Sequence, residues 1–211
     1  MSVVVGVIAA HGPAIYGDAL TSTGMPYRTD VDPKIFAGRG CLYGIAGGAA
    51  ACERLATAFH DAFFQGSTLR PDRQDIVRVL LEVEHAQEAE FLFLTRSQIF
   101  YGCGDGTLTT IRGDFAAIGC GGAFATGYLE CHRALGHDPT SDKYVREAME
   151  ASFVAYPDSC GGRVDRLALS SLDLPRKASP EVSTNGSNGS NGSNGRGLLD
   201  TPEVAMPIGR R

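Results

Sequence analysis

Residues 41–64 read CLYGIAGGAAACERLATAFHDAFF, and within this stretch the apolar pattern changes its period. Cys41 to Ala46 is a short β-prone segment without a charged residue, which is typical of a buried strand. Two glycines follow and suit a tight turn, because glycine adopts backbone angles that other residues avoid. From Ala49 to Phe64 the apolar residues recur at helical spacing. The stretch therefore predicts a strand that turns directly into a helix.

The same order of strands and helices extends in both directions from this stretch. Two strand sets are indicated, each followed by two helices, and a last strand follows. Because every apolar helix stripe needs a sheet face to cover, this order predicts an α+β protein built as a four-layer αββα sandwich, with two antiparallel sheets flanked by helix pairs. The expected strands are Val3–Ala10, Ala14–Tyr16, Ile35–Phe36, Cys41–Ala46, Phe91–Leu94, Ile99–Cys103, Leu108–Ile111, Phe115–Ile118 and Val164–Leu169. The expected helices are 49–64, one after Pro71 that includes Ile76 to Leu81, one that opens at Gly119–Gly122 and runs to about Leu135, and 144–153.

The length of 211 residues suits one domain with a sizeable core, and we expect that domain to span residues 1–174. Beyond it Asn, Gly and Ser repeat without an apolar period, which predicts a flexible low-complexity tail over residues 175–211. A short apolar peptide, Leu198-Leu199, follows the repeat. The tail is either plain disordered chain or a tether for a docking peptide.

Charge and hydropathy exclude several classes of partner. Asp and Glu number 24 against 19 Lys plus Arg, and a net charge of -5 argues against a nucleic-acid-binding surface. The longest apolar run, Val3 to Ala10, is far shorter than the roughly 20 residues of a membrane span, and no basic stretch precedes it. We expect a cytoplasmic protein with neither nucleic acid nor membrane as a partner.

The cysteine and histidine patterns favour neither a disulfide framework nor a metal site. The six cysteines form no C-x-x-C pair, and the five histidines lack the spacing of metal ligands. The glycine-rich segment at Gly119 departs from the dinucleotide-binding pattern, because Phe124 stands at the position of the last glycine. We therefore expect reduced thiols, no metal and no cofactor.

Ser2 directly follows Met1, and a small second residue permits removal of the initiator methionine. The serine would then carry a hydroxyl nucleophile and a free α-amine that acts as its base. An α-amine has an ordinary pKa of about 7.7 to 8.0, so part of it is neutral at physiological pH. Met-Ser is also a common way for a chain to begin, so Ser2 alone does not establish this chemistry.

Three further residues suit such a nucleophile. Lys34 is the one lysine among the first 142 residues, and its compact charge would lower the pKa of a neighbouring amine. Asp18 ends the second expected strand, where it would either hold that ammonium or make a turn. We place Gly44 at the end of a strand before the first helix, where a backbone N–H would stabilise an oxyanion or glycine would serve a tight turn.

The spacing of these residues resembles that of the proteasome β-type and bacterial HslV-type peptidases of the N-terminal nucleophile hydrolase superfamily. The resemblance covers roughly residues 2 to 170 and rests on Ser2, Gly17-Asp18, Lys34-Ile35 and Gly44-Ile-Ala-Gly-Gly48. It implies the four-layer fold, hydrolysis of peptide bonds by Ser2, and assembly into homo-oligomeric rings of about six or seven subunits fed by an ATP-dependent unfoldase. Most members of the family use threonine after cleavage of a propeptide, whereas here removal of Met1 would suffice.

Two later glycine-rich motifs match the family with departures. Gly119-Cys120-Gly121-Gly122 stands where the family has Gly-Ser-Gly-Gly, so Cys120 replaces a serine that helps to manage the proton of the terminal amine. Asp158 and Ser159 belong to a motif one residue shorter than the family's, and either Ser159 or Cys160 takes the place of its serine. The resemblance also implies an S1 pocket lined by Thr21, Phe36, Leu42, Ala46 and Ala50.

Two alternatives to a peptidase stay open at this point. A chain that retained Met1 would be a catalytically inactive subunit that builds a ring without cutting anything. A chain with a reactive Ser2 but no peptidase activity would be an amidohydrolase for a small amide, as other N-terminal nucleophile hydrolases are.

Overall fold

The structure is a computed structural model that describes residues 2–22, 28–29, 33–65, 71–84 and 86–169, with the backbone alone described at 21–22 and 28–29. The expected domain boundary near residue 174 and the expected tail 175–211 lie outside the described residues. Within the described part, no helix is long and apolar enough to cross a membrane.

The first sheet consists of β1 (Val4–Ala9), β2 (Gly12–Asp18), β10 (Phe115–Ile118) and β11 (Val164–Ala168). Its strands pair antiparallel in the order β10-β1-β2-β11. β1 and β2 form a hairpin whose turn includes Gly12, with a φ of 107° that only glycine adopts easily. Val164 lies opposite Asp18, so the chain that follows the last helix returns to the end of β2 that carries this aspartate.

The second sheet consists of β5 (Ile35–Gly38), β6 (Cys41–Gly47), β7 (Ala86–Leu94), β8 (Ile99–Gly104) and β9 (Leu108–Ile111). These strands form an antiparallel meander in sequence order. β7 begins five residues before the predicted strand, because polar residues such as Glu88 hide its first half in the sequence and a register shift lies between Ala86 and Glu90. A separate pair joins β3 (Thr21–Ser22) to β4 (Arg28–Thr29).

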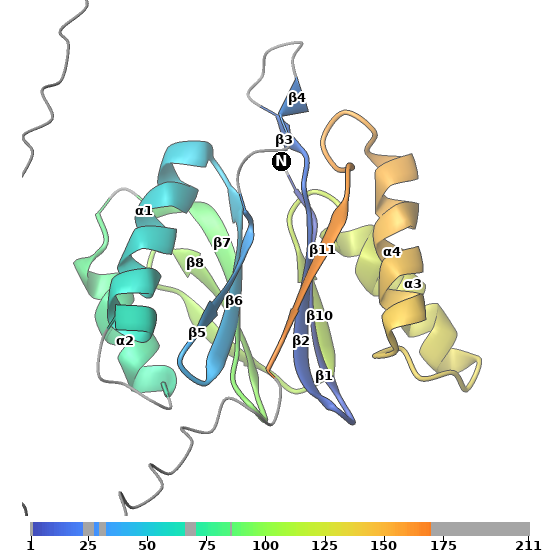
Figure 1. Cartoon of the computed structure of the whole chain (residues 1–211), viewed down its shortest axis with the longest axis horizontal. Coiled ribbons are helices and arrows are strands. Elements are labelled where there is room, and N and C mark those ends of the chain that lie inside the picture. The colour runs from blue at the N-terminus through green and yellow to red at the C-terminus, as the bar shows by residue number, and fades with distance from the viewer. Residues whose placement is uncertain (1, 23–27, 30–32, 66–70, 85, 170–211) are drawn as a thin grey trace, which may run out of the picture. The chain divides into compact units, whose positions relative to one another are not determined.

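Among the described residues, four α-helices complete the fold: α1 (Ala49–His60), α2 (Arg73–Glu82), α3 (Gly122–Ala134) and α4 (Asp142–Ala155). α1 and α2 cover the outer face of the second sheet, and α3 and α4 cover the outer face of the first (Figure 1). The predicted four-layer αββα sandwich is confirmed. α1 ends four residues before the predicted Phe64, and a π-helical turn, Asp61–Gln65, continues it. In this turn the Phe63 carbonyl accepts a hydrogen bond from Arg39 N–H (2.8 Å), outside the helix.

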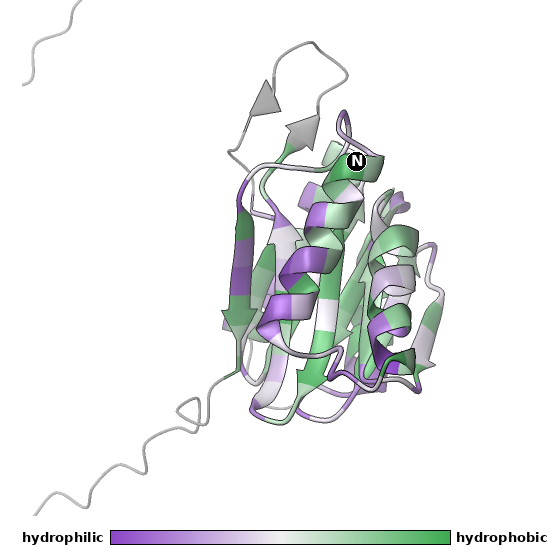
Figure 2. Cartoon of the chain, turned by 90° about the vertical axis from the view of Figure 1, so that its right-hand side faces the viewer, coloured by the Kyte–Doolittle hydropathy of each residue, from purple (hydrophilic) through white to green (hydrophobic). Residues whose placement is uncertain are grey.

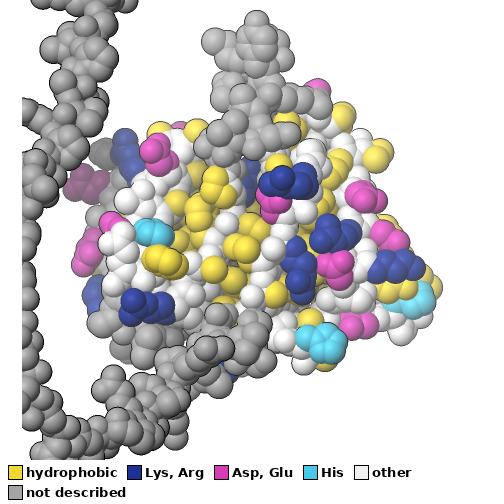
Figure 3. All heavy atoms as spheres, in the orientation of Figure 1, with side chains coloured by type: hydrophobic (Ala, Val, Ile, Leu, Met, Phe, Trp, Pro, Cys, Tyr) yellow, Lys and Arg dark blue, Asp and Glu magenta, His cyan; other side chains and the backbone are white. Residues whose placement is uncertain are grey.

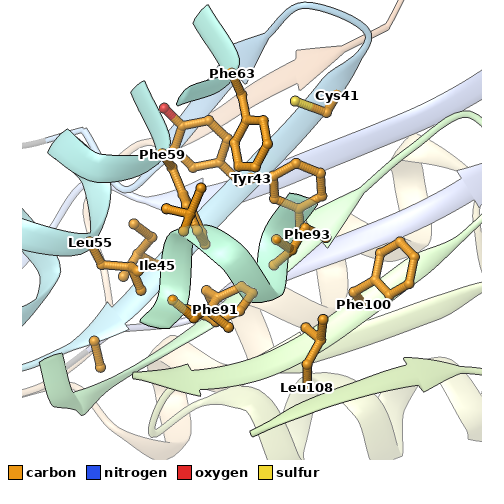
Figure 4. Packing of buried hydrophobic residues seen from close by; sticks show 14 of the residues in the cluster. Cys41, Tyr43, Ile45, Leu55, Phe59, Phe63, Phe91, Phe93, Phe100 and Leu108 are labelled. Carbon is orange, nitrogen blue, oxygen red and sulfur yellow. The ribbon is translucent and has the colours of Figure 1, made fainter. Parts of the chain in front are cut away.

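The alternation of side chains along each strand divides the core into three layers. Aromatic residues of the second sheet, among them Tyr43, Phe91 and Phe93, pack against Phe59 and Phe63 (Figure 4). The outer layer on the other side joins the first sheet to α3 and α4, and Figure 2 shows hydrophobic colour on the strands behind these helices.

The middle layer joins the two sheets, and glycine sets how closely they approach. A Cβ on Gly44 would lie 2.5 Å from Val4 Cγ1 and 2.8 Å from Ile15 Cδ1. Real Cβ atoms do not approach other carbon atoms so closely, so a side chain at this position would push the sheets apart. Gly44 therefore permits close packing of β6 on β1 and β2.

Candidate active site

Ser2 lies two residues before β1, where it is only 5% exposed. Its carbonyl oxygen accepts hydrogen bonds from Gly121 N–H (3.4 Å) and from the Cys120 thiol (3.3 Å). Gly119 adopts a φ of 83°, and a Cβ there would lie 2.0 Å from the Ser2 carbonyl oxygen. The turn between β10 and α3 therefore fits closely against the backbone of Ser2, and glycine makes this approach possible. Met1 lies outside the described residues.

Asp18 is the centre of the site and its side chain has no exposed surface. Its Oδ1 accepts hydrogen bonds from Val3 N–H (2.9 Å) and from Lys34 Nζ (2.9 Å), and its Oδ2 accepts one from Gly161 N–H (3.2 Å). A buried carboxylate is stable only when it is paired and hydrogen-bonded, and these three donors supply both conditions. The predicted pairing of Asp18 with Lys34 is present in the structure.

Lys34 directly precedes β5 and reaches from the second sheet to the first. Its side chain is 10% exposed, and its Nζ also donates to the Leu20 carbonyl oxygen. Burial raises the pKa of the Cys52 thiol on α1, while the positive charge of Lys34 acts in the opposite direction. The field of Lys34 therefore extends to the first turns of α1 as well as to Asp18.

Glu90 on β7 reaches the site from the second sheet, and the sequence reasoning missed it. Its Oε1 accepts a hydrogen bond from Gly119 N–H (2.8 Å), so it fixes the turn that contacts Ser2. The only signal in the sequence is an acidic residue directly before the apolar run Phe91–Leu94. Glu90 and Cys52 are two residues near the site that the spacing of the motifs did not identify.

The predicted position of Gly44, the expected oxyanion donor, at the end of a strand is wrong. Gly44 lies within β6, which continues to Gly47, and pairs with Ile35 and Leu92. Ile45 N–H donates to the Lys34 carbonyl oxygen (2.9 Å). Since N–H groups alternate sides along a strand, the Gly44 N–H turns toward β7 and the Gly47 N–H turns toward the side of Lys34.

Gly47 is therefore the glycine that suits an oxyanion donor. It is exposed at the end of β6, and its φ is 140°. A Cβ there would lie 2.1 Å from the Glu88 carbonyl oxygen, so only glycine fits. The sequence has glycine at positions 44, 47 and 48 and does not show where the strand ends, so it does not distinguish Gly47 from Gly44.

Both later motifs lie in turns at the site. The turn after α4 carries Asp158, which is exposed, and Ser159, which is 6% exposed. The Cys160 thiol lies 3.0 Å from the Cys120 thiol, and it is 1% exposed. Cys160 therefore contacts Cys120, the residue that stands where the family has the serine of the first motif.

Of the five residues expected in the S1 pocket, Phe36, Leu42 and Ala46 do not share one face of the second sheet. Phe36 stacks on Tyr43 with ring centroids 5.1 Å apart, on the face of the second sheet that α1 covers. Leu42 and Ala46 lie on the opposite face, buried between the sheets. Phe36 pairs with Tyr43, and the two side chains lie on the same face of the sheet. Because neighbouring residues in a strand face opposite ways, Leu42 turns to the other face, away from Phe36.

The remaining two pocket residues lie elsewhere. Ala50 is exposed in the first turn of α1. Thr21 begins β3, and its side chain lies outside the described part of the structure. Ala46 lies close to the turn that contacts Ser2, because a Cβ on Gly119 would lie 3.4 Å from Ala46 Cβ.

The arrangement places Ser2, the buried ion pair of Asp18 and Lys34, and the backbone N–H of Gly47 at the same end of the two sheets. Such a set supplies a nucleophile, a positive charge that lowers the pKa of a nearby amine, and a donor for developing negative charge. Among the described residues, no group of three or more His, Cys, Asp or Glu side chains could hold a metal ion.

The four layers form the proteasome-type fold, which the chain shares with solved structures of low sequence identity. The chain is similar to HslV from Trypanosoma brucei, with 19% identity and a TM-score of 0.61 over 80% of this chain and 99% of that one. It is also similar to BPH from Thiobacillus denitrificans in complex with epoxomicin, with 21% identity and a TM-score of 0.62 over 80% and 98% of the two chains.

A third similar structure is the Gly-1 mutant of Anbu from Hyphomicrobium sp. strain MC1. It shares 13% identity and a TM-score of 0.66 over 81% of this chain and 82% of that one. No protein-family model and no curated protein matches the chain. At these identities the likeness establishes the fold, and the predicted fold class is confirmed.

Proposed function

We propose that the chain is an N-terminal serine peptidase of the proteasome type, matured by removal of Met1. The observation that carries the proposal is the Asp18 carboxylate. One of its oxygen atoms accepts hydrogen bonds from both Val3 N–H and Lys34 Nζ, so the lysine is tied to the residue next to Ser2.

In the proposed reaction the Ser2 hydroxyl oxygen attacks the carbonyl carbon of a peptide bond, and the α-amine of Ser2 takes the hydroxyl proton directly or through a water molecule. The positive charge of Lys34 lowers the pKa of this amine and so keeps part of it neutral. The Gly47 N–H donates to the oxyanion. The protonated amine then gives its proton to the leaving nitrogen, and water hydrolyses the remaining ester.

The Cys120, Asp158 and Ser159 motifs have supporting roles in this proposal. Cys120 donates to the Ser2 carbonyl and so helps to fix the nucleophile. Asp158 and Ser159 lie in the turn that precedes Gly161, which holds Asp18. As expected partners we propose peptide or unfolded protein as the substrate, further copies of the chain in a ring, and an ATP-dependent unfoldase.

The test is the intact mass of the purified protein with and without a peptide epoxyketone, a reagent that needs a terminal hydroxyl and its own α-amine to form a stable ring. We expect loss of Met1 and one adduct per chain. Ser2→Ala should abolish the adduct. Ser97→Ala, in the exposed turn between β7 and β8, is the matched control and should leave the adduct unchanged.

The outcomes separate the proposal from its alternatives. Retention of Met1 with no adduct would overturn the hydrolase and leave a structural subunit. An adduct without cleavage of peptides or unfolded proteins would point instead to a small amide as the substrate.

A further inference from the structure

Two thiols meet directly behind the nucleophile. Cys120 comes from the turn between β10 and α3, and Cys160 from the turn between α4 and β11, yet their Sγ atoms lie 3.0 Å apart. The Cys120 Sγ also lies 3.3 Å from the carbonyl oxygen of Ser2. Ser2 and the two cysteines are therefore connected by a continuous series of contacts.

The two thiols differ in their access to solvent. Cys160 is 1% exposed, whereas Cys120 is partly exposed. Burial, and then the hydrogen bond to Cys120, raise the pKa of the Cys160 thiol, so it holds its proton at neutral pH. Cys120 has one S–H group and donates it to the Ser2 carbonyl oxygen, so Cys160 is the donor between the two sulfur atoms.

The surroundings hold the pair in place. A Cβ on Gly121 would lie 3.1 Å from Cys160 Sγ and 2.8 Å from Ser152 Cβ, so the glycine gives the buried thiol the space it occupies. Ser152 in turn donates to the Gly121 carbonyl oxygen (3.0 Å). Among the described residues, four other cysteines are free thiols: Cys41, Cys52, Cys103 and Cys131.

We propose that Cys120 and Cys160 are a dithiol–disulfide couple that is closed by a peroxide-class oxidant and that lowers the reactivity of Ser2 when it is oxidised. The effect on reactivity rests on the proposed function, whereas formation of the disulfide does not. The pairing depends on two turns that only the folded chain brings together.

The chemistry balances with hydrogen peroxide as the oxidant. The Cys120 sulfur attacks one peroxide oxygen, the O–O bond breaks, and a sulfenic acid and one water form. The Cys160 sulfur then attacks the sulfenic sulfur, the S–O bond breaks, and the hydroxyl leaves as a second water with the thiol proton. Two thiols are oxidised to one disulfide, and one peroxide is reduced to two waters.

Oxidation changes what supports Ser2. The disulfide has no S–H group, so the Ser2 carbonyl loses its donor on Cys120 and keeps the longer one from Gly121 N–H. The two sulfur atoms must also move closer together to form a bond, and this movement shifts the turn that contacts Ser2. We expect the rate of epoxyketone addition at Ser2 to fall roughly three- to tenfold, the range that loss of one hydrogen bond produces.

The test uses the full chain, reduced, freed of reductant, treated with hydrogen peroxide and then alkylated in urea. Peptide mapping without reduction should find a cross-linked peptide that joins Cys120 to Cys160, with the other four cysteines alkylated. Cys160→Ala should abolish this cross-link. Cys131→Ser, which removes an exposed cysteine, is the matched control and should keep it.

Other products would overturn the couple: cross-links between other cysteines, or a sulfinic acid at Cys120 with Cys160 alkylated. The rate arm compares oxidised protein before and after treatment with dithiothreitol. A rate that falls and recovers supports the proposal, and a rate unaffected by a complete cross-link overturns the effect on Ser2. If Ser2 does not react even in the reduced protein, the proposed function fails, while the cross-link still supports the couple.

Discussion

A single buried carboxylate joins three parts of this chain that are distant in sequence. Asp18 accepts hydrogen bonds from Val3, from Lys34 and from Gly161, so removal of any one donor leaves a charge without its full set of partners. An uncompensated buried charge costs several kcal/mol, far more than a surface ion pair is worth. At the scale of the residue, the site and the stability of the fold therefore depend on the same atoms.

We predict that Lys34→Ala lowers the free energy of unfolding by about 3 to 5 kcal/mol and abolishes epoxyketone addition at Ser2. The Asp18 carboxylate would keep two backbone donors but lose its counter-charge. The measurement is a urea titration at pH 7 together with the intact-mass assay. Lys143→Ala, on the exposed surface of α4, is the control. Equal stability of the two variants would show that the buried ion pair contributes nothing.

The sequence predicted part of this site, and the parts that it missed or misplaced have a physical cause. The spacing of Ser2, Asp18 and Lys34, and the glycines around Cys120, carried the family resemblance that pointed to these residues. Gly44 was misplaced because the end of a strand depends on pairing with β5 and β7, which the sequence does not show. Glu90 was missed because its partner, the Gly119 N–H, lies 29 residues away.

At the scale of the elements, the apolar period predicted every strand of the two large sheets and all four α-helices, with errors at their ends. The two larger errors have local causes: polar residues in the first half of β7, and the π-helical turn after α1. The face to which each side chain turns depends on the pairing of strands, so the sequence did not show that Phe36 and Leu42, which the resemblance put in one pocket, lie on opposite faces.

We predict that Gly44→Ala lowers the free energy of unfolding by about 1 to 3 kcal/mol, because the added methyl group forces β6 away from β1 and β2. Gly127→Ala on α3 is the matched control. Its Cβ would meet nothing within 4 Å, so we expect a gain of about 0.5 to 1 kcal/mol from the higher helix propensity of alanine. Urea titration of both variants checks the pair, and an unchanged Gly44→Ala would contradict close packing of the sheets.

At the scale of the whole molecule, both outer layers expose large apolar side chains. On α3 and just after α4, Phe124 is 50% exposed and contacts Tyr156 edge to face, and Val154 on α4 is 84% exposed. On the other side Leu81 of α2 is 79% exposed. On the face shown in Figure 3, hydrophobic side chains gather in the middle, with charged side chains on both sides of them. Such surfaces are typical of proteins that associate.

We predict that the full chain sediments as an assembly whose mass is a multiple of 22.3 kDa, in keeping with the proposed ring. The double variant Phe124→Ser/Val154→Ser should shift the distribution to smaller species. Glu130→Ser, at an exposed polar position of α3, is the control and should not. The measurement is sedimentation velocity, and a monomer at tens of micromolar wild-type protein would contradict the ring.

The bond from Gly161 to Asp18 has a consequence for the time at which the site is completed during synthesis. A ribosome adds the residues in order, so Ser2, Asp18 and Lys34 all leave it long before Gly161 does. Until then the carboxylate lacks one donor, and the turn that carries Cys160 is absent. Ser2 and Asp18 therefore gain their full surroundings only when the last strand of the first sheet is in place.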